Sequence, residues 1–413
     1  MSAIADLSAD QKKALDTLAV NNFREYLQIP SVHPNVDYAP CVEFLKKQAK
    51  TLGLPVQVFS TNPGKPIVVL TWTGKEPLLP SILLNSHMDV VPVFPEKWTY
   101  KPFDAHVDEK GNIYARGAQD MKCVGIQYLE AIRRLKQRGV SLRRTVHISF
   151  VPDEETGGVE GMKAFVNTND FKNLNVGFAL DEGMASPNND SPVFYAERVI
   201  WQMHFHVPGH PGHGSLLLEN TAGEKAARLL NKIYEFRRGE QQKMKDNANL
   251  TIGDVTSVNV TQMHGGVQTN VIPPEFVVTV DCRLAITVDF VKFEETLNKW
   301  CKEAGQGVYI EYEQKQTLIE PTKVDNTNPY WVAFKTSMDE LGLTVKSQVF
   351  PGGTDSRYIR NAGIPALGYS PMPNTPVLLH DNDEYLSTDV FLKGIDIYSK
   401  IIPAVGNLVD RTG

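Results

Sequence analysis

The sequence has few cysteines, and no two of them lie close together along the chain. Its 413 residues include only Cys41, Cys123, Cys282 and Cys301. Without a C-x-x-C pair, neither a disulfide framework nor a thiolate zinc site is indicated. Because isolated cysteines are typical of a reducing compartment, we expect a cytoplasmic protein.

Long hydrophobic runs and an excess of positive charge are also missing. No stretch approaches the roughly 18 apolar residues of a membrane span, and the first ten residues lack the basic and apolar regions of a signal peptide. The net charge is −6 with the signs interspersed, so there is no basic stripe to bind a phosphate backbone. We therefore expect no membrane or nucleic-acid partner.

The first part of the chain alternates between strands and helices. Ser8 and Gln11 form a capping-box pattern that predicts an N-terminal amphipathic helix. Short β-rich runs and a helical stretch follow; they cover 67–72, 82–84, 125–137 (the helix), 146–151 and 176–180. Such alternation predicts an α/β fold with a mixed or parallel sheet covered by helices.

The pattern changes after Pro192 and changes back near residue 315. Alternating strands surround a helix-like stretch at 219–237, which indicates a compact α+β insert, and then α/β texture returns with a final helix near 390–402. A chain of this length exceeds one ordinary core. We predict a catalytic domain made of 1–194 and 317–413, interrupted by a smaller domain at 195–316.

Histidine and acidic residues fall where the predicted strands end. His87 and Asp89 follow one strand, Glu154 and Glu155 another, Glu182 a third, and His380 follows the run 377–379. Ligand sites of open α/β sheets gather beyond the carboxyl ends of the strands, so these segments can converge. Imidazole and carboxylate without thiolate suit a catalytic zinc site.

Asp120 is the natural candidate for a carboxylate that bridges two metal ions. It lies in a glycine-containing turn before a helix, where an aspartate can instead serve as an N-cap. Taken singly, each acidic residue of this set is better explained as a cap or a surface charge than as a metal ligand.

Five motifs occur in one order: His-x-Asp at 87–89, Arg-Gly-x-x-Asp-Met-Lys at 116–122, Asp-Glu-Glu-Thr-Gly-Gly at 153–158, Leu-Asp-Glu-Gly at 180–183 and Leu-Leu-His at 378–380. Together they resemble the motifs of the two-zinc amidohydrolase family that includes aminoacylases, acetylornithine deacetylases and glutamate carboxypeptidases. The likeness spans nearly the whole chain. The segments at 268–274 and 353–360 look most like those of the aminoacylases.

The resemblance implies two Zn²⁺ ions per subunit. One ion would be held by His87, Asp120 and Glu182, and the other by Asp120, Glu155 and His380. Glu154 would act as general base, and Asp89 would orient the imidazole of His87. The alternative reading of Glu154 and Glu155 is an exposed acidic turn.

The resemblance also implies a ferredoxin-like insert that serves as dimerisation and lid domain. His213 would reach the active site of a partner subunit and stabilise the oxyanion, which requires a homodimer. Substrate contacts are expected from Asn270, Arg283, Gly353, Thr354 and Arg360. For any one arginine, a surface salt bridge explains the residue as well.

The implied activity is hydrolysis of an N-acyl-L-amino acid, with a short acyl group and a neutral side chain, to a free amino acid and a carboxylate. A dipeptidase or an acetylornithine-type deacetylase would share the metal motifs. A catalytically inactive binding or scaffold homologue would have a broken site, whereas every ligand position and Glu154 are present here.

Overall fold

The computed structural model describes residues 7–409, so the first six residues of the N-terminal segment discussed above lie outside it. The chain forms two compact units. Unit 1 contains the chain up to Tyr195 together with Glu320–Ser347 and the segment from Gly353 onward, and unit 2 contains Ala196–Ile319 and Gln348–Gly352. The sequence had placed the insert at 195–316 and had assigned all of 317–413 to the catalytic domain.

The main sheet has eight strands. Their order is β1 (Val56–Asn62), β2 (Lys65–Trp72), β6 (Val146–Val151), β3 (Ser81–His87), β7 (Val176–Asp181), β16 (Ala366–Gly368), β8 (Asp190–Glu197) and β15 (Thr344–Phe350). The four central strands β6, β3, β7 and β16 run parallel, whereas β1 and β2 on one side and β8 on the other pair antiparallel. The sheet is therefore mixed, as predicted.

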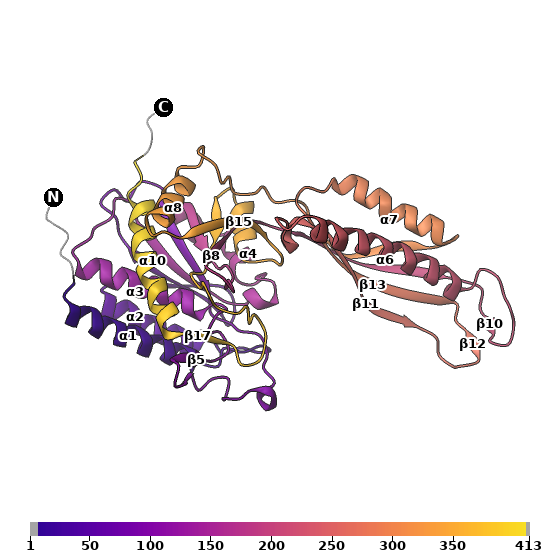
Figure 1. Cartoon of the computed structure of the whole chain (residues 1–413), viewed down its shortest axis with the longest axis horizontal. Helices are drawn as coiled ribbons and strands as arrows, with labels where there is room; N and C mark the ends of the chain where they lie inside the picture. Colours follow the sequence, from indigo (N-terminus) through magenta and orange to yellow (C-terminus); the bar gives the residue numbers. More distant parts are fainter. Residues whose placement is uncertain (1–6, 410–413) are drawn as a thin grey trace. The chain divides into compact units, whose positions relative to one another are not determined.

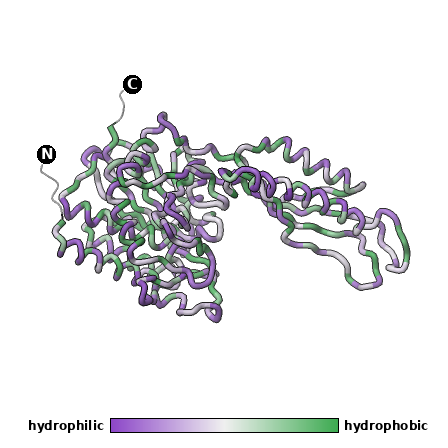
Figure 2. Tube along the Cα trace, in the orientation of Figure 1, coloured by the Kyte–Doolittle hydropathy of each residue, from purple (hydrophilic) through white to green (hydrophobic). Residues whose placement is uncertain are grey.

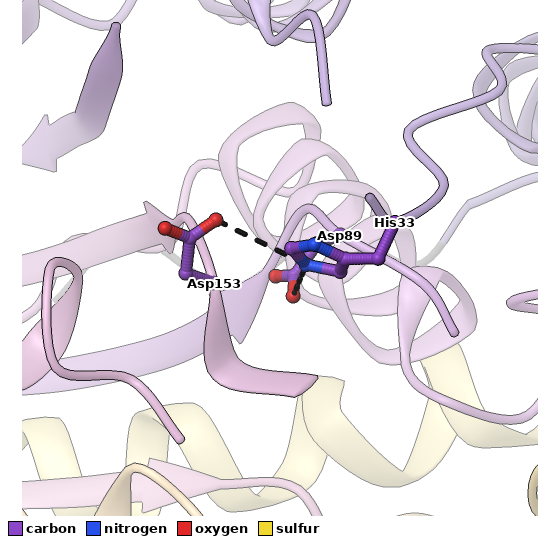
Figure 3. A group of neighbouring side chains, drawn as sticks. All are labelled: His33, Asp89 and Asp153. Carbon is purple, nitrogen blue, oxygen red and sulfur yellow. Dashed lines mark hydrogen bonds and ion pairs between the residues drawn. The ribbon is translucent and has the colours of Figure 1, made fainter. Parts of the chain in front are cut away.

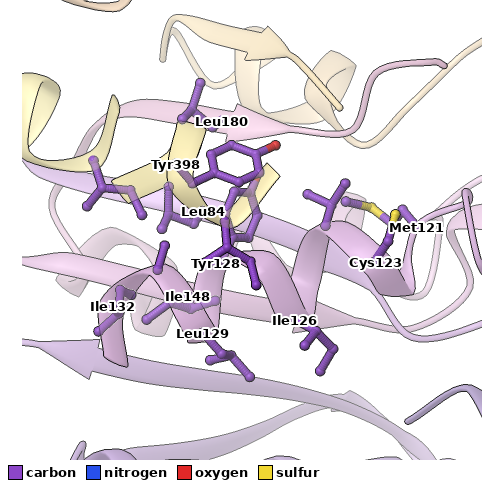
Figure 4. Packing of buried hydrophobic residues seen from close by; sticks show 14 of the residues in the cluster. Leu84, Met121, Cys123, Ile126, Tyr128, Leu129, Ile132, Ile148, Leu180 and Tyr398 are labelled. Atoms are coloured by element: carbon purple, nitrogen blue, oxygen red, sulfur yellow. The ribbon is translucent and has the colours of Figure 1, made fainter. Parts of the chain in front are cut away.

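Helices cover both faces of this sheet (Figure 1). One face carries α1 (Ala9–Leu27), α2 (Ala39–Leu52), α3 (Lys122–Gln137), α8 (Pro329–Glu340) and α10 (Thr388–Gly406); the other carries the short α4 (Met162–Phe165), α5 (Asn169–Asn173) and α9 (Ser356–Asn361). Each face of the sheet has its own hydrophobic core, because successive strand residues point to opposite faces. Leu84 belongs to the first core, beneath the five helices, and Leu83 belongs to the second core, beneath the three short helices. In the first core, Tyr128 and Leu129 of α3 lie beside Leu84 and Ile148 (Figure 4).

A small antiparallel sheet lies in the same unit. Its strands are β17 (Tyr385–Ser387), β5 (Asn112–Tyr114) and β4 (His106–Val107), with β5 in the centre. Pairing of β17 with β5 joins the segment that follows His380 to the segment that precedes Asp120. The unit also contains the single-turn helices η1 (Pro95–Lys97) and η2 (Glu154–Thr156).

Unit 2 has a four-stranded antiparallel sheet with the order β11 (Ser257–Gly265), β13 (Glu275–Leu284), β9 (Val199–Pro208) and β14 (Tyr309–Lys315). Along the chain, α6 (Ala222–Asp246) and the single-turn η3 (Ile252–Asp254) follow β9, and α7 (Phe290–Ala304) follows β13. The two long helices lie side by side on one face of the sheet (Figure 1). This βαββαβ arrangement is ferredoxin-like.

The two helices of unit 2 are amphipathic. The tube in Figure 2 changes colour repeatedly between hydrophilic and hydrophobic along α6 and α7, and the apolar side chains form a core with the sheet that includes Leu229, Ile233, Leu297 and Trp300. A two-stranded ribbon, β10 (Gly212–His213) with β12 (Val271–Ile272), belongs to the same unit.

The N-terminal helix begins as predicted. Ser8 Oγ accepts the N–H of Gln11 at 3.2 Å, and Gln11 Oε1 accepts the N–H of Ser8 at 2.9 Å. The prediction of a strand at 377–379 was wrong, because this segment pairs with no strand. Pro376 lacks an N–H, and the N–H of Leu378 binds the side chain of Gln119 at 3.1 Å instead.

Short contacts explain why Gln348–Gly352 belongs to unit 2 rather than to the domain that the sequence predicted. Arg198 donates to the carbonyl oxygen of Pro351 at 2.8 Å and 3.0 Å. A Cβ on Gly253 would lie 2.0 Å from the carbonyl oxygen of Val349, so the two backbones touch.

All four cysteines are buried and unpaired. Within residues 7–409, no helix is long and apolar enough to cross a membrane.

Candidate active site

The candidate ligands gather at one end of three adjacent parallel strands. His87 is the last residue of β3, Glu182 follows β7, and Glu154 and Glu155 lie in η2 just after β6. Asp120 comes from the loop before α3, and His380 from the loop before β17. The structure therefore brings together all five predicted ligands and the predicted base.

Asp120 lies between the two histidines. Its Oδ1 is 3.0 Å from Nε2 of His87, and its Oδ2 is 3.3 Å from Nε2 of His380. Helix α3 begins at Lys122 with Met121 in the cap position and without a side-chain cap bond, so Asp120 is not an N-cap. Each carboxylate oxygen instead faces a different imidazole, as a bridging ligand requires.

Two triplets of possible ligand atoms share Asp120. The ligand atoms of His87, Asp120 and Glu182 lie within 4.8 Å of one another, as do those of Asp120, Glu155 and His380. His87 Nε2 is 3.5 Å from Glu182 Oε2, and His380 Nε2 is 3.1 Å from Glu155 Oε2. These pairs match the two ligand sets expected from the sequence.

The charges of the site also suit two divalent cations. Burial and the Asp120 carboxylate raise the pKa of Glu155 to about 7. The same two causes raise the pKa of Glu182. Glu155 Oε1 is buried and has no hydrogen-bond partner. Hydrogen bonds to Asp120 and Glu155 raise the pKa of His380 to about 10. Several buried carboxylates lie close together here, and one of their oxygens has no partner. Such a set suits metal ions, because the ions would supply the positive charge that balances the carboxylates.

The backbone turns sharply at the two adjacent glutamates. Asp153 has a φ of 61°, Gly157 has 99° and Gly158 has 64°. A Cβ on Gly158 would lie 2.6 Å from Oδ1 of Asp355, so this position needs glycine for space as well as for φ. Glu154 is 8% exposed, and burial together with the carboxylate of Glu182 raises its pKa well above the ordinary value. The exposed acidic turn considered above is therefore absent.

Asp89 contacts the turn more closely than it contacts His87. Its Oδ1 accepts the N–H of Glu154 at 3.2 Å, and its Oδ2 accepts the N–H of Glu155 at 3.0 Å. The Nδ1 atom of His87 lies 2.9 Å from the backbone oxygen of Asp89 but 3.5 Å from its carboxylate. The main chain thus orients the imidazole, and the carboxylate of Asp89 holds the turn at Glu154 and Glu155.

His33 completes this network and was missed by the sequence analysis. Its Nε2 lies 2.8 Å from Oδ2 of Asp89 and 3.9 Å from Oδ1 of Asp153 (Figure 3). These three residues could themselves hold a cation. However, the ammonium group of Lys65 already lies 2.5 Å from Oδ2 of Asp153, and Tyr38 donates to its Oδ1 at 2.6 Å. Asp153 therefore has partners without a metal ion.

The loop containing Asp120 is held by a buried pair that sequence reasoning also missed. Glu384 is fully buried and lies 2.9 Å from the guanidinium of Arg116, which is 3% exposed. The available signal was an acidic residue shortly after His380 and an arginine shortly before Asp120. Neither spacing alone distinguishes a buried pair from surface charges.

The residues predicted to bind substrate from the insert all lie in unit 2. His213 is exposed on β10, and its Nδ1 is 2.8 Å from Oγ of Ser215. Asn270 lies next to it, because its carbonyl oxygen accepts the N–H of Gly214 at 2.8 Å. Arg283 donates to Asp281 through Nε at 2.9 Å and Nη2 at 3.1 Å.

His204 and His206 lie in strand β9 of the sheet of unit 2. His206 has carboxylates on both sides, with Glu275 3.2 Å from its Nδ1 and Glu311 3.1 Å from its Nε2. Because the two carboxylates face opposite ring nitrogens, they cannot meet at one metal ion.

The remaining predicted substrate residues lie in unit 1. Thr354 is buried, and its Oγ1 accepts the N–H of Ser356 at 3.3 Å. Gly353 immediately precedes it and is partly exposed. Arg360 is 7% exposed and donates to the carbonyl oxygens of Ala366 and Phe194. These contacts engage its guanidinium group, and contact of Arg360 with substrate stays a prediction.

Comparison with known proteins identifies the family. Residues 83–404 match the model described as peptidase family M20/M25/M40. The chain belongs to this family. It is 51% identical to aminoacylase-1A of Rattus norvegicus over 390 residues, which are 94% of this chain and 96% of the relative. Aminoacylase-1 of Homo sapiens is 50% identical with the same coverage, so the expected likeness to aminoacylase-1 is confirmed.

Solved structures confirm the fold. A metallo-carboxypeptidase of the M20 family from Sulfolobus solfataricus superposes with a TM-score of 0.71 at 18% sequence identity and covers 94% of this chain and 99% of its own. A tripeptidase of Staphylococcus aureus superposes with a TM-score of 0.74 at 20% sequence identity and covers 95% of this chain and 98% of its own. At this identity the likeness concerns the fold alone. The α/β architecture predicted from the sequence is that of the M20 family.

Proposed function

We propose that this protein hydrolyses the amide bond of N-acyl-L-amino acids and releases a free L-amino acid and a short carboxylate. The observation that carries the proposal is Asp120, whose two carboxylate oxygens face His87 and His380 within a set of buried carboxylates. About half of the residues are identical to those of aminoacylase-1 over 94% of the chain, which favours this activity over others of the family.

We assign two Zn²⁺ ions to the two triplets. His87, Asp120 and Glu182 would hold one ion, and Asp120, Glu155 and His380 the other. When bound, the ions would polarise the amide carbonyl and lower the pKa of the attacking water. Asp120 belongs to both triplets, so we expect its loss to affect both ions.

Glu154 is proposed as the general base. Its carboxyl group is buried beside the ligands, and its raised pKa suits a group that must take up a proton near neutral pH and give it back. It would accept the proton of the water that attacks the carbonyl and then donate it to the leaving amine nitrogen. Asp89 fixes the backbone of this base through the N–H groups of Glu154 and Glu155.

We propose that the enzyme is a homodimer in which His213 acts on the active site of the partner chain. An exposed imidazole on a two-stranded ribbon is suited to donate a hydrogen bond to a developing oxyanion. Asn270 is held on the same ribbon and would bind the acyl carbonyl. Arg283 is proposed to contact substrate from unit 2, for which it must exchange its bonds with Asp281. Gly353, Thr354 and Arg360 are proposed as the candidates in unit 1 for binding the α-carboxylate.

We further propose that the protein works in the cytoplasm, which the four unpaired buried cysteines support. A dipeptidase and an acetylornithine-type deacetylase remain the enzymatic alternatives, and an inactive homologue is the non-enzymatic one. Comparing kcat/KM for N-acetyl-L-methionine, N-acetyl-L-ornithine and L-alanyl-L-methionine separates them. We expect the first substrate to be fastest; a faster dipeptide or acetylornithine would refute the assignment, and no turnover of any would favour the inactive homologue.

A further inference from the structure

The two proposed metal positions differ in what holds their ligands. His87 is 1% exposed and ends a seven-residue strand in the middle of the main sheet, and Glu182 directly follows the neighbouring strand β7. His380 lies in a loop, has a φ of 60°, and its side chain is 55% exposed. The sheet therefore fixes the first position, whereas the position of His380 depends on other contacts.

Glu384 supplies contacts on the Asp120 side. Its Oε1 accepts the N–H groups of Gln119 at 2.6 Å and Asp120 at 3.2 Å, and its Oε2 accepts the N–H of Gly117 at 3.1 Å. One fully buried carboxylate thus accepts three backbone N–H groups of the loop that carries the bridging ligand. Charged acceptors of backbone N–H groups make the stronger class of hydrogen bond.

Arg116 supplies contacts on the His380 side. Its Nη1 donates to Oε2 of Glu384 and to the carbonyl oxygen of Asp381, both at 2.9 Å, and its Nη2 donates to the carbonyl oxygen of His380 at 3.4 Å. The guanidinium lies 5.3 Å from the centre of the Trp98 ring. The planar group can hold a carboxylate and two carbonyls at once, which an ammonium group cannot do with the same geometry.

We propose that Glu384 and Arg116 are a positioning pair that sets the affinity of the second metal position, formed by Asp120, Glu155 and His380, and affects the first position less. The inference rests on the proposed two-metal site. It assigns the pair no contact with substrate: the pair acts by joining two loops that are far apart in the sequence, each of which carries one ligand of the second position. Loss of such outer contacts typically weakens metal binding about 10- to 100-fold.

Zinc titration of the full-length protein after metal removal tests the proposal. The variants are Glu384→Gln, which keeps the size but removes the charge, and Arg116→Lys, which keeps the charge but removes the planar guanidinium group. Glu240→Gln is the matched control, since Glu240 is a buried carboxylate of unit 2 that accepts the N–H of Thr256 at 2.8 Å. Competition with a chelator of known affinity gives both dissociation constants, and circular dichroism reports folding.

We expect Glu384→Gln to weaken the second zinc about 10- to 100-fold and Arg116→Lys to weaken it less, with the first zinc affected less than the second in both. The zinc concentration that gives half-maximal activity should rise, while kcat at saturating zinc stays near that of the wild type. Equal weakening of both ions, or no change in a folded variant, would overturn the inference. If Glu384→Gln does not fold, Arg116→Lys decides alone.

The wild-type titration separates this inference from the proposed function. A wild-type protein that binds fewer than two zinc ions would contradict the proposed site itself. Two bound ions in the wild type, together with unchanged binding in the variants, would contradict only the role of Glu384 and Arg116.

Discussion

Nε2 of His33 lies 2.8 Å from Oδ2 of Asp89, the same oxygen that accepts the N–H of Glu155. Through this shared acceptor, a side chain that follows the first helix contacts the turn that carries the proposed base. The hydrogen bond to Asp89 raises the pKa of His33. The carboxylate of Asp89 is therefore held between a histidine and two backbone amides.

Replacing Asp89 by Asn should lower kcat about 10- to 100-fold, because an amide group offers only one acceptor to two N–H donors and His33. His33→Ala should lower kcat less, since the two backbone bonds remain. Steady-state kinetics with zinc content measured on the same samples checks both. Asp108→Asn, in the turn between β4 and β5, is the control. Unchanged kcat in Asp89→Asn would show that the network does not position the base.

Replacing Glu154 by Gln should lower kcat about 10²- to 10⁴-fold while the zinc content stays at that of the wild type, because the amide cannot take up a proton. Glu160→Gln, on a nearby glutamate with a side chain that is 54% exposed, should leave both quantities unchanged. Rapid hydrolysis by Glu154→Gln would assign the proton transfer to another group.

His213 acting in trans predicts complementation between two inactive variants. In a mixture of His213→Asn and Glu154→Gln chains, a mixed dimer contains one complete site, made of Glu154 from one chain and His213 from the other. Random exchange of equal amounts should restore about a quarter of the wild-type activity. The mixture is assayed before and after exchange in mild denaturant. A mixture that exchanges subunits and stays inactive would place His213 in the active site of its own chain or outside catalysis.

His147 predicts a loss of stability in acid. Burial lowers its pKa from 6.5 to about 4, and its ring nitrogens contact Thr71 Oγ1 and the carbonyl oxygen of Leu174. Between these values the unfolded chain binds a proton that the folded chain does not. The free energy of unfolding therefore falls as the pH drops below 6.5, by about 2 kcal/mol at pH 5.

Urea unfolding at pH 7 and pH 5, followed by tryptophan fluorescence, measures this effect. The drop in stability between the two pH values should be smaller in His147→Gln than in the wild type. His264→Gln, on an exposed histidine, should behave as the wild type does. An equal drop in all three proteins would show that His147 does not cause it.

The clustering of several candidate ligands could be predicted from the sequence because they lie at the ends of strands with clear hydrophobic patterns. His87 ends β3, and Glu154 and Glu182 come just after β6 and β7; the three strands are adjacent and parallel, so strand order alone brings these residues together. His380 was also identified, although its segment is a loop and not a strand. Its motif, rather than its secondary structure, carried that prediction.

The supporting residues could not be predicted in the same way. His33, Arg116 and Glu384 act through contacts between segments that are distant in the sequence, and no local pattern marks them. The role of Asp89 was anticipated only in part, since its spacing from His87 suggested contact with the imidazole. The backbone turn at Asp153 places its carboxylate against two amides instead.

The most direct test of the central claim is the rate of methionine release from N-acetyl-L-methionine. This rate is measured before metal removal, after metal removal and after zinc is returned. A metal-dependent amide hydrolase built on Asp120 loses turnover when a chelator removes the ions and regains it with two zinc ions per chain. Asp120→Asn should not regain it. Turnover that survives complete metal removal would contradict the account.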